Sequence, residues 1–255
     1  MKKIFLVLSS LIAFFFADSQ GILNRVNAKV NQQKGSPLVN DITKVITESQ
    51  ASSKLTNEDI INGLKEALYV SSKNSINKLG VLDGFLGNEA IKIVMPDETQ
   101  KLVSTLRKIG MGDKVDKAIL SMNRAAEDAA AGVGDIFIGA IKQMTIADGL
   151  SILKGSDTAA TNYLRNSTQK DLTDKIRPII QNALKKVDAT KYWTDVFTNY
   201  NKYLHQNVNT DLTAYVIERT LNGLFYSLAE EEKKIRKDPA AQVTEILKKV
   251  FGNKS

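Results

Sequence analysis

The chain has 255 residues, of which 43% are hydrophobic and 25% charged, with a formal net charge of +7. These fractions are typical of a folded globular protein and exclude a wholly disordered chain. The lack of cysteine excludes disulfides, thiolate nucleophiles and cysteine-ligated metals. The single histidine, His205, excludes sites that need two imidazoles from one chain. We therefore predict no cofactor and no metal site.

The first 19 residues have the layout of a secretory signal peptide. Residues 1–3 are basic, residues 4–16 are almost wholly apolar, and small residues precede a predicted cut before Gln20. This apolar run is too short to cross a bilayer comfortably as a helix, which needs about 20 residues. An uncleaved N-terminal anchor is the alternative. We predict a periplasmic or secreted protein with no transmembrane helix after cleavage.

Residues 20–55 are polar, show little periodicity and contain a Gly-Ser-Pro break at 35–37. We predict a loosely ordered N-terminal arm there, with short helices near 22–30 and 38–50. Residues 56–255, by contrast, show helical periodicity throughout, with no interior linker and no internal repeat. They are predicted to form one domain.

The helix signals of this domain start at Thr56, three residues before Asp59 in an approximate capping box, and the first helix is expected to end at Gly80. Residues 90–95 alternate in part and form the one plausible strand, which Pro96 would end. Further helices are predicted at about 97–110, 113–131, 133–143, 145–154, 157–166, 168–187, 189–206, 210–237 and 239–251. The predicted fold class is all-α: a single multi-helix, bundle-like domain with at most one very short strand pair.

The densest candidate feature is the segment Asn123-Arg124-Ala125-Ala126-Glu127-Asp128. A 3-4-3-4 repeat in and beside it predicts a buried seam of Ile119, Met122, Ala126, Ala129 and Val133. The alanines of this seam would let a neighbouring helix approach closely. At 100° per residue, Arg124, Glu127 and Asp128 fall away from this seam. These charges can form a constellation that faces a cleft, or an ordinary pair of Arg124 with Asp128 on a solvated face.

Two further segments carry candidate side chains. Thr145 and Asp148 fit another approximate capping box at a helix break. Thr161 and Arg165 are four residues apart and share a helix face. Arg165 has the shape to bind a carboxylate or a phosphate with two hydrogen bonds, or to pair with Glu127 or Asp148 inside the bundle. The spacing leaves these alternatives open.

Other kinds of site have little support in the sequence. A calcium loop over 207–218 fails because Leu212 stands where glycine is required. There is no nucleophile elbow, no phosphate loop and no basic-aromatic run, so we predict no nucleic-acid partner. An aromatic stripe fits a core or a groove lining better than a cofactor site. It consists of Tyr192, Trp193, Phe197, Tyr200 and Tyr203.

Motifs along nearly the whole mature chain point to one family. The most specific is Met122-Asn123-Arg124-Ala125-Ala126-Glu127. Others include Asp83-Gly84-Phe85, Ile91-Lys92-Ile93, Met144-Thr145-Ile146, Ala159-Ala160-Thr161 and Asp238-Pro239. The chain resembles the bacterial secreted family catalogued as domain of unknown function 4197. The resemblance implies a signal-bearing, mainly helical envelope protein and supplies no activity. It favours a central polar cluster of Asn123, Arg124, Glu127, Asp148, Thr161 and Arg165.

Two hypotheses of function follow. The first is a non-catalytic ligand-binding or protein-interaction role in the cell envelope, with an unknown partner and an apolar groove lined by residues such as Trp193, Tyr200 and Phe225. The alternative is an envelope hydrolase of cell-wall glycan or peptide, with Glu127 or Asp148 as general acid or base in a water-accessible cleft. The missing catalytic motifs favour the first. Attachment to a membrane surface is a third, weaker option.

Overall fold

The computed structural model describes residues 55–186, 189–204 and 211–252. Contacts divide the chain into two units, Met1–Leu55 and Thr56–Ser255. The predicted signal peptide and all of the predicted arm except Leu55 lie outside the described residues. The helices of the described residues belong to the second unit.

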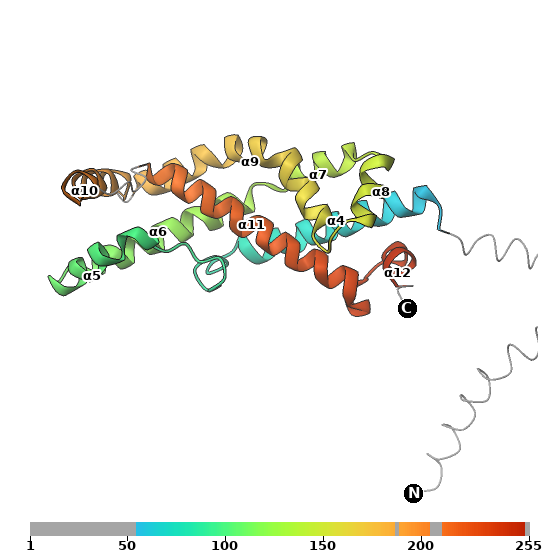
Figure 1. The fold of residues 1–255 in the computed structure, drawn as a ribbon, viewed down its shortest axis with the longest axis horizontal. Helices are drawn as coiled ribbons and strands as arrows, with labels where there is room; N and C mark the ends of the chain where they lie inside the picture. The colour runs from blue at the N-terminus through green and yellow to red at the C-terminus, as the bar shows by residue number, and fades with distance from the viewer. Residues whose placement is uncertain (1–54, 187–188, 205–210, 253–255) are drawn as a thin grey trace, which may run out of the picture. The chain divides into compact units, whose positions relative to one another are not determined.

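The described part of the second unit contains helices and no strand, which confirms the predicted all-α fold class. Figure 1 labels the helices along the chain. Their bounds are α4 (Asn57–Leu79), η1 (Asp97–Thr99), α5 (Gln100–Lys108), α6 (Gly112–Ala131), α7 (Gly134–Gln143), α8 (Ile146–Lys154), α9 (Ala159–Lys185), α10 (Ala189–Leu204), α11 (Leu212–Lys237), η2 (Pro239–Ala241) and α12 (Glu245–Phe251).

Both predicted capping boxes are present. In front of α4, the Thr56 hydroxyl accepts a hydrogen bond from the Asp59 N–H, and the Asp59 carboxylate accepts one from the Thr56 N–H. Thr145 and Asp148 make the same reciprocal pair in front of α8. Local sequence therefore sets where these two helices begin.

Three local predictions were wrong. The helix expected at 239–251 is interrupted: η2 ends at Ala241, and α12 begins only at Glu245, where the Thr244 side chain caps it by accepting a hydrogen bond from the Leu247 N–H.

The helices expected at 157–166 and 168–187 are one helix, α9, whose buried face runs without a break through Leu164, Thr168 and Leu172. The Thr168 hydroxyl does not cap a new helix but donates to the Leu164 carbonyl at 2.6 Å. Residues 90–95 do not form a strand, because no second strand lies beside them among the described residues. The backbone of Ile93 pairs with a side-chain amide of α6 instead.

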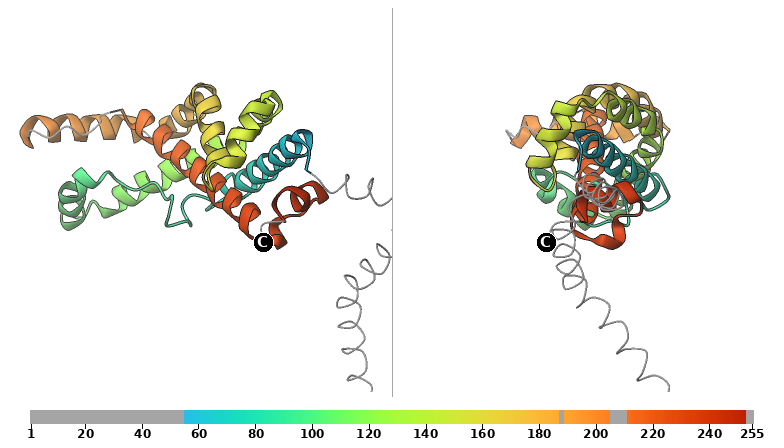
Figure 2. Two further views of the ribbon diagram at one scale, coloured as in Figure 1. Left: turned by 45° about the vertical axis from the view of Figure 1, so that its right-hand side comes forward. Right: turned by 90° about the vertical axis from the view of Figure 1, so that its right-hand side faces the viewer.

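The core lies between α4, α6, α9 and α11, each of which packs against the other three. In Figure 1, α11 runs diagonally across α6 and α4, and the two views of Figure 2 show the same helices from other sides. Most of the predicted seam on α6 is buried: Met122 and Val133 are 1% and 0% exposed, and Ile119 is partly buried. Its alanines, Ala126 and Ala129, are fully buried together with Ala125 and Ala130 beside them. Their small side chains let the neighbouring helices approach α6 closely.

The aromatic stripe contributes to the core where it is described. Trp193 and Phe197 on α10 are buried, and the Trp193 ring also stacks on Tyr215 of α11 at 5.6 Å between centroids. Phe225 is 1% exposed. Trp193 and Phe225 therefore do not line an open groove. The side chains of Tyr192, Tyr200 and Tyr203, together with His205 and the first part of the excluded calcium loop, lie outside the described residues.

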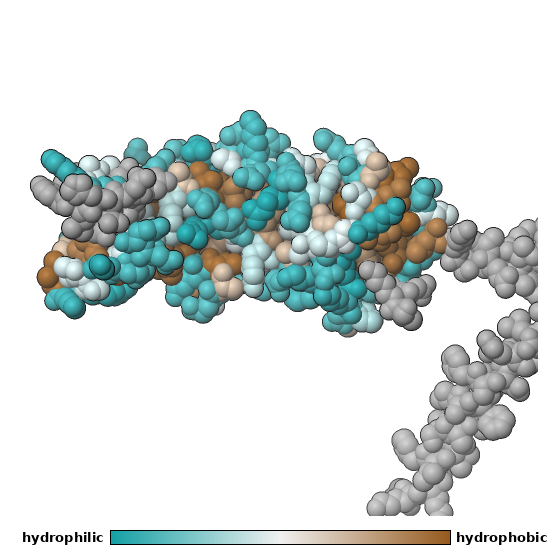
Figure 3. Space-filling view, in the orientation of Figure 1, coloured by the Kyte–Doolittle hydropathy of each residue, from teal (hydrophilic) through white to brown (hydrophobic). Residues whose placement is uncertain are grey.

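The surface is mostly polar, with a hydrophobic area around the turn between α7 and α8 and the start of α4 (Figure 3). Ile138 on α7 and Ile146 on α8 are 38% and 53% exposed. Among the described residues, no single helix has the length and hydropathy needed to cross a membrane. The pair α7 and α8, bent by 101°, reaches these values only when the two helices are taken together.

Candidate functional site

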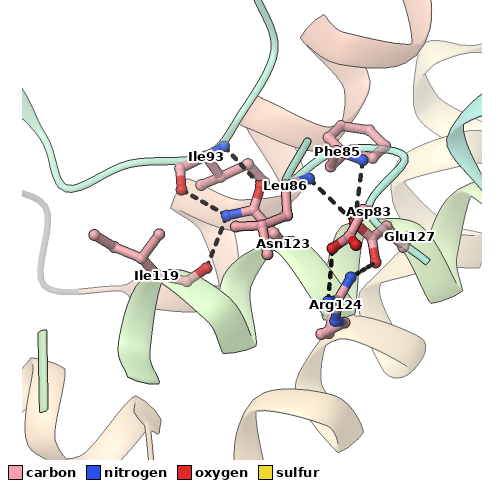
Figure 4. A network of polar contacts seen from close by, with 8 residues as sticks. All are labelled: Asp83, Phe85, Leu86, Ile93, Ile119, Asn123, Arg124 and Glu127. Atoms are coloured by element: carbon pink, nitrogen blue, oxygen red, sulfur yellow. Dashed lines mark hydrogen bonds and ion pairs between the residues drawn. The ribbon is translucent and has the colours of Figure 1, made fainter. Parts of the chain in front are cut away.

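Asn123 on α6 is fully buried and holds the segment that leads from α4 to α5 (Figure 4). Its Oδ1 accepts a hydrogen bond from the Ile93 N–H at 2.9 Å, and its Nδ2 donates to the Ile93 carbonyl at 2.7 Å. The second Nδ2 hydrogen goes to the Ile119 carbonyl at 2.7 Å. The amide supplies the paired donor and acceptor that an adjacent strand would offer to an extended segment.

Glu127 lies one turn further along α6 and is 4% exposed. One carboxylate oxygen accepts the N–H groups of Phe85 and Leu86, both at 3.1 Å. The other accepts a hydrogen bond from Arg124 Nη1 at 2.6 Å. Both oxygens are therefore engaged in contacts that fix the turn at 83–87.

Arg124 completes this group by bonding Asp83 Oδ1 through Nη2 at 2.8 Å (Figure 4). Asp83 has a φ of 65°, in the left-handed region that non-glycine residues seldom adopt. The hydrogen bonds to Glu127 and Asp83 raise the pKa of Arg124 above its usual value. The ordinary Arg124–Asp128 pair was a wrong interpretation, because the 83–87 turn draws both Arg124 and Glu127 toward itself while Asp128 stays exposed.

The same segment is also held by α11. Tyr215 donates its phenolic hydrogen to the Val94 carbonyl at 2.7 Å. Phe85 is fully buried, and its ring lies against Gly223, where an added Cβ would come within 2.5 Å of Phe85 Cε1. Asn123, Arg124 and Glu127 therefore belong to a structural clamp on residues 83–95, closed to solvent at Asn123 and Glu127.

Thr161 belongs to a second buried group, at the start of α9. Its N–H and its hydroxyl both donate to Glu232 Oε2 of α11, at 2.8 and 2.7 Å. The other oxygen, Oε1, accepts the Ala160 N–H at 3.1 Å and Arg236 Nε at 2.9 Å. Since Thr158, the residue before α9, makes no capping bond through its side chain, Glu232 caps this helix from a distance.

Arg165, one turn further along α9, contacts neither Glu127 nor Asp148 through a hydrogen bond or ion pair in the described structure. Its guanidinium lies 4.4 Å from the ring centroid of Phe225, and Nη1 donates to Asn222 Oδ1 at 3.2 Å. Burial lowers the pKa of Arg165 below its usual value. The side chain is a half-buried cation resting on an aromatic ring.

Asp148 stands apart from the other candidates. Its Oδ2 accepts the Thr145 N–H at 2.9 Å and the Thr145 hydroxyl at 2.7 Å, and these bonds lower its pKa below the usual value. The residue also lines an open depression of about 310 Å³ between α8 and α9. Its lining is mixed: Ile152 and Ala159 are apolar, and the polar side chains are those of Asp148, Ser151, Ser156, Asn162, Tyr163 and Asn166.

Residues 54–252 match the sequence profile of the family described as Protein of unknown function (DUF4197). The chain belongs to this family. The match confirms the resemblance inferred from the short motifs. No curated protein and no solved structure is significantly similar to the chain.

The candidate residues of this DUF4197 protein do not form one cluster. Within the described residues, no hydrogen bond or ion pair joins the clamp of α6, the Thr161 group, Arg165 and Asp148. Sequence reasoning also missed Glu232 and Arg236, because the run Glu230 to Lys234 resembles a solvated face. A signal was present: Leu221, Leu224, Leu228, Glu232, Ile235 and Arg236 recur at helical spacing, and all of them are buried.

The chemistry open to these groups is limited. Glu127 is enclosed, and both its oxygens hold protein groups, so a substrate has no route to it. Asp148 is accessible, but its lowered pKa is opposite to the raised value that a general acid needs at neutral pH. In the part of the DUF4197 chain that is described, no group of His, Cys, Asp and Glu residues could hold a metal ion.

Proposed function

We propose that this protein is an exported, non-catalytic binding protein of the cell envelope. The observation that carries the proposal is the contrast between its acids. Glu127 and Glu232 are buried, and both oxygens of each carboxylate accept hydrogen bonds from backbone N–H groups or arginines. Asp148 reaches a surface depression as a carboxylate of lowered pKa, suited to hold a ligand rather than to transfer a proton.

The aromatic-groove form of the hypothesis finds no support at Trp193 or Phe225, because both side chains belong to the core. Binding through the surface between α8 and α9 agrees better with the structure. The polar clamp and the Glu232 group then have structural roles: they hold the helices in place, as buried charges do when they are paired and hydrogen-bonded.

Native mass spectrometry of the protein purified from its own host tests both parts of the proposal. An intact mass that begins at Gln20, in a periplasmic or secreted fraction, supports export. A stoichiometric extra mass supports binding. Recovery of the full-length chain from the cytosol contradicts the envelope part.

Two variants separate binding from hydrolysis. Glu127→Gln is expected to lower stability by about 1–3 kcal/mol, because Arg124 loses a charged partner. The parent protein is expected to cleave neither cell-wall glycan nor peptide, and Glu127→Gln and Asp148→Asn are expected to leave this unchanged. A glycan- or peptide-cleaving activity that Asp148→Asn abolishes without unfolding would overturn the non-catalytic proposal.

A further inference from the structure

The depression between α8 and α9 is lined by polar side chains together with the apolar Ile152 and Ala159. Ser151, Asn162 and Asn166 offer hydroxyl and amide groups, and Asp148 offers a carboxylate. Among the described residues, the side-chain polar atoms of Ser151, Asn162, Tyr163 and Asn166 have no hydrogen-bond partner. These groups are available to a ligand, which would meet donors and acceptors from two helices at once.

The backbone around the depression is fixed by contacts that leave these side chains free. Local side chains often cap a helix start, but here Glu232 of α11 takes the N–H groups of Ala160 and Thr161 from behind. At the other wall, α8 is fixed by its capping box at Thr145. The ends of α8 and α9 also meet closely, since a Cβ on Gly155 would lie 2.6 Å from the Cβ of Ala159. The site is therefore held in shape before any ligand arrives.

The charge states of Asp148 and Tyr163 limit which ligands the depression can bind. Asp148 is a carboxylate at neutral pH, since its hydrogen bonds with Thr145 lower its pKa. Burial and the nearby Asp148 charge raise the pKa of Tyr163, so its phenol stays protonated and can donate. The lining contains no Lys or Arg, so phosphates and other anions would meet a net negative charge. A lipid chain would bring hydrocarbon against the Asp148 carboxylate, which costs free energy.

We infer that this depression binds a sugar ring of a neutral glycan, held by the face of Tyr163 and by Asp148, Asn162 and Asn166. A pyranose ring presents a face of C–H groups that packs on an aromatic ring. Its rim carries hydroxyls that donate to a carboxylate and exchange hydrogen bonds with amides. The volume of about 310 Å³ is enough for one ring, with the rest of a chain outside. The inference rests on the proposed function and names its ligand class.

The test is an NMR titration of the protein with tri-N-acetylchitotriose, with maltotriose and spermidine as separate probes. Amide shifts are expected at 148–166 with either sugar, with a Kd on the order of 1 mM, because an open site buries little of the ligand. Tyr163→Ala and Asn162→Ala are each expected to weaken binding about tenfold or more. Spermidine is expected to leave these amides unshifted.

Matched variants test whether a loss of binding comes from a change in folding, and whether the sugar binds at another position. Asp59→Asn weakens the equivalent capping box of α4, away from the depression, and so controls for the capping part of Asp148→Asn, although it also removes the ion pair with Lys249. Tyr69, 43% exposed in a separate depression between α4 and α7, controls for Tyr163. If Tyr69→Ala removes the shifts and Tyr163→Ala does not, the proposed site is wrong.

The outcomes also separate this inference from the proposed function. Shifts with spermidine alone, or no shift with either sugar, overturn the sugar assignment and leave a non-catalytic role intact. Cleavage of a sugar during the titration, lost in Asp148→Asn but not in Asp59→Asn, overturns the non-catalytic role and leaves the glycan contact in place.

Discussion

Thr161 and Glu232 are 71 residues apart in the sequence, yet two hydrogen bonds join them at the first turn of α9. The Thr161 N–H and hydroxyl both reach the same carboxylate oxygen. Because Glu232 also pairs with Arg236, with both side chains 3% exposed, one buried charge pair ties the end of α11 to the start of α9. This pair stands directly behind the α8–α9 depression.

Glu232→Gln is expected to destabilise the protein by about 3–5 kcal/mol, because Arg236 would remain buried without its counter-charge. Urea unfolding measures the change. Glu230→Gln on the same helix is the control, since the side chains of Glu230 and Lys233 are 42% and 44% exposed and their pair is worth about 1 kcal/mol or less. Equal changes in the free energy of unfolding for the two substitutions would show that the buried pair stabilises the protein no more than the partly exposed pair.

Asn123→Ala is expected to cost about 2–4 kcal/mol, because the N–H and carbonyl of Ile93 would lose their partners inside the protein. Hydrogen exchange gives a local readout. The Ile93 amide should exchange faster in the variant, while amides in the middle of α9 keep their protection relative to global unfolding. An unchanged Ile93 rate would mean that Asn123 does not hold this segment.

Gly223→Ala and Gly139→Ala are expected to have opposite effects. A Cβ at Gly223 would press on the buried Phe85 ring, at a cost of about 1–3 kcal/mol. Gly139 lies inside α7 with nothing within 4 Å of an added Cβ, so alanine there should stabilise the helix by about 0.5–1 kcal/mol. Thermal or urea unfolding measures both. A stabilised Gly223→Ala variant would contradict the close contact with Phe85.

Asp59 should make stability sensitive to acid. Hydrogen bonds from Lys249 and from Thr56 lower its pKa from 3.8 to about 2 in the folded protein. A lowered folded pKa means that the ionised group stabilises the fold above the unfolded value, and that this contribution is lost as the pH falls from about 4 to about 2. Melting temperatures between pH 5 and pH 2 should therefore fall less for Asp59→Asn than for the parent. Lys249→Gln should reproduce part of this difference; an unchanged slope in both variants would refute the assignment.

The secondary structure was predictable where its cause is local. The capping boxes at Thr56 and Thr145 each close within three residues, and the alanine seam of α6 is a short-range periodicity. The division of α9 and the strand at 90–95 were predicted wrongly. In α9 the buried Leu164, Thr168 and Leu172 continue one helix face across the expected break. In the second segment a side-chain amide, and not a neighbouring strand, pairs with the backbone of Ile93.

The sequence by itself determined the all-α class, the positions of several helix ends and the family, because each depends on residues that are close together along the chain. Only the tertiary structure decided where the charged side chains go. Glu127 meets Phe85 across 42 residues, and Glu232 meets Ala160 across 72. Helical spacing shows on which helix face a carboxylate lies. The segment whose backbone N–H groups donate to that carboxylate is determined by how the helices pack. Some of the polar residues therefore belong to buried structural groups, and others line one open depression. The spacing of these residues along the chain does not predict which residue belongs to which.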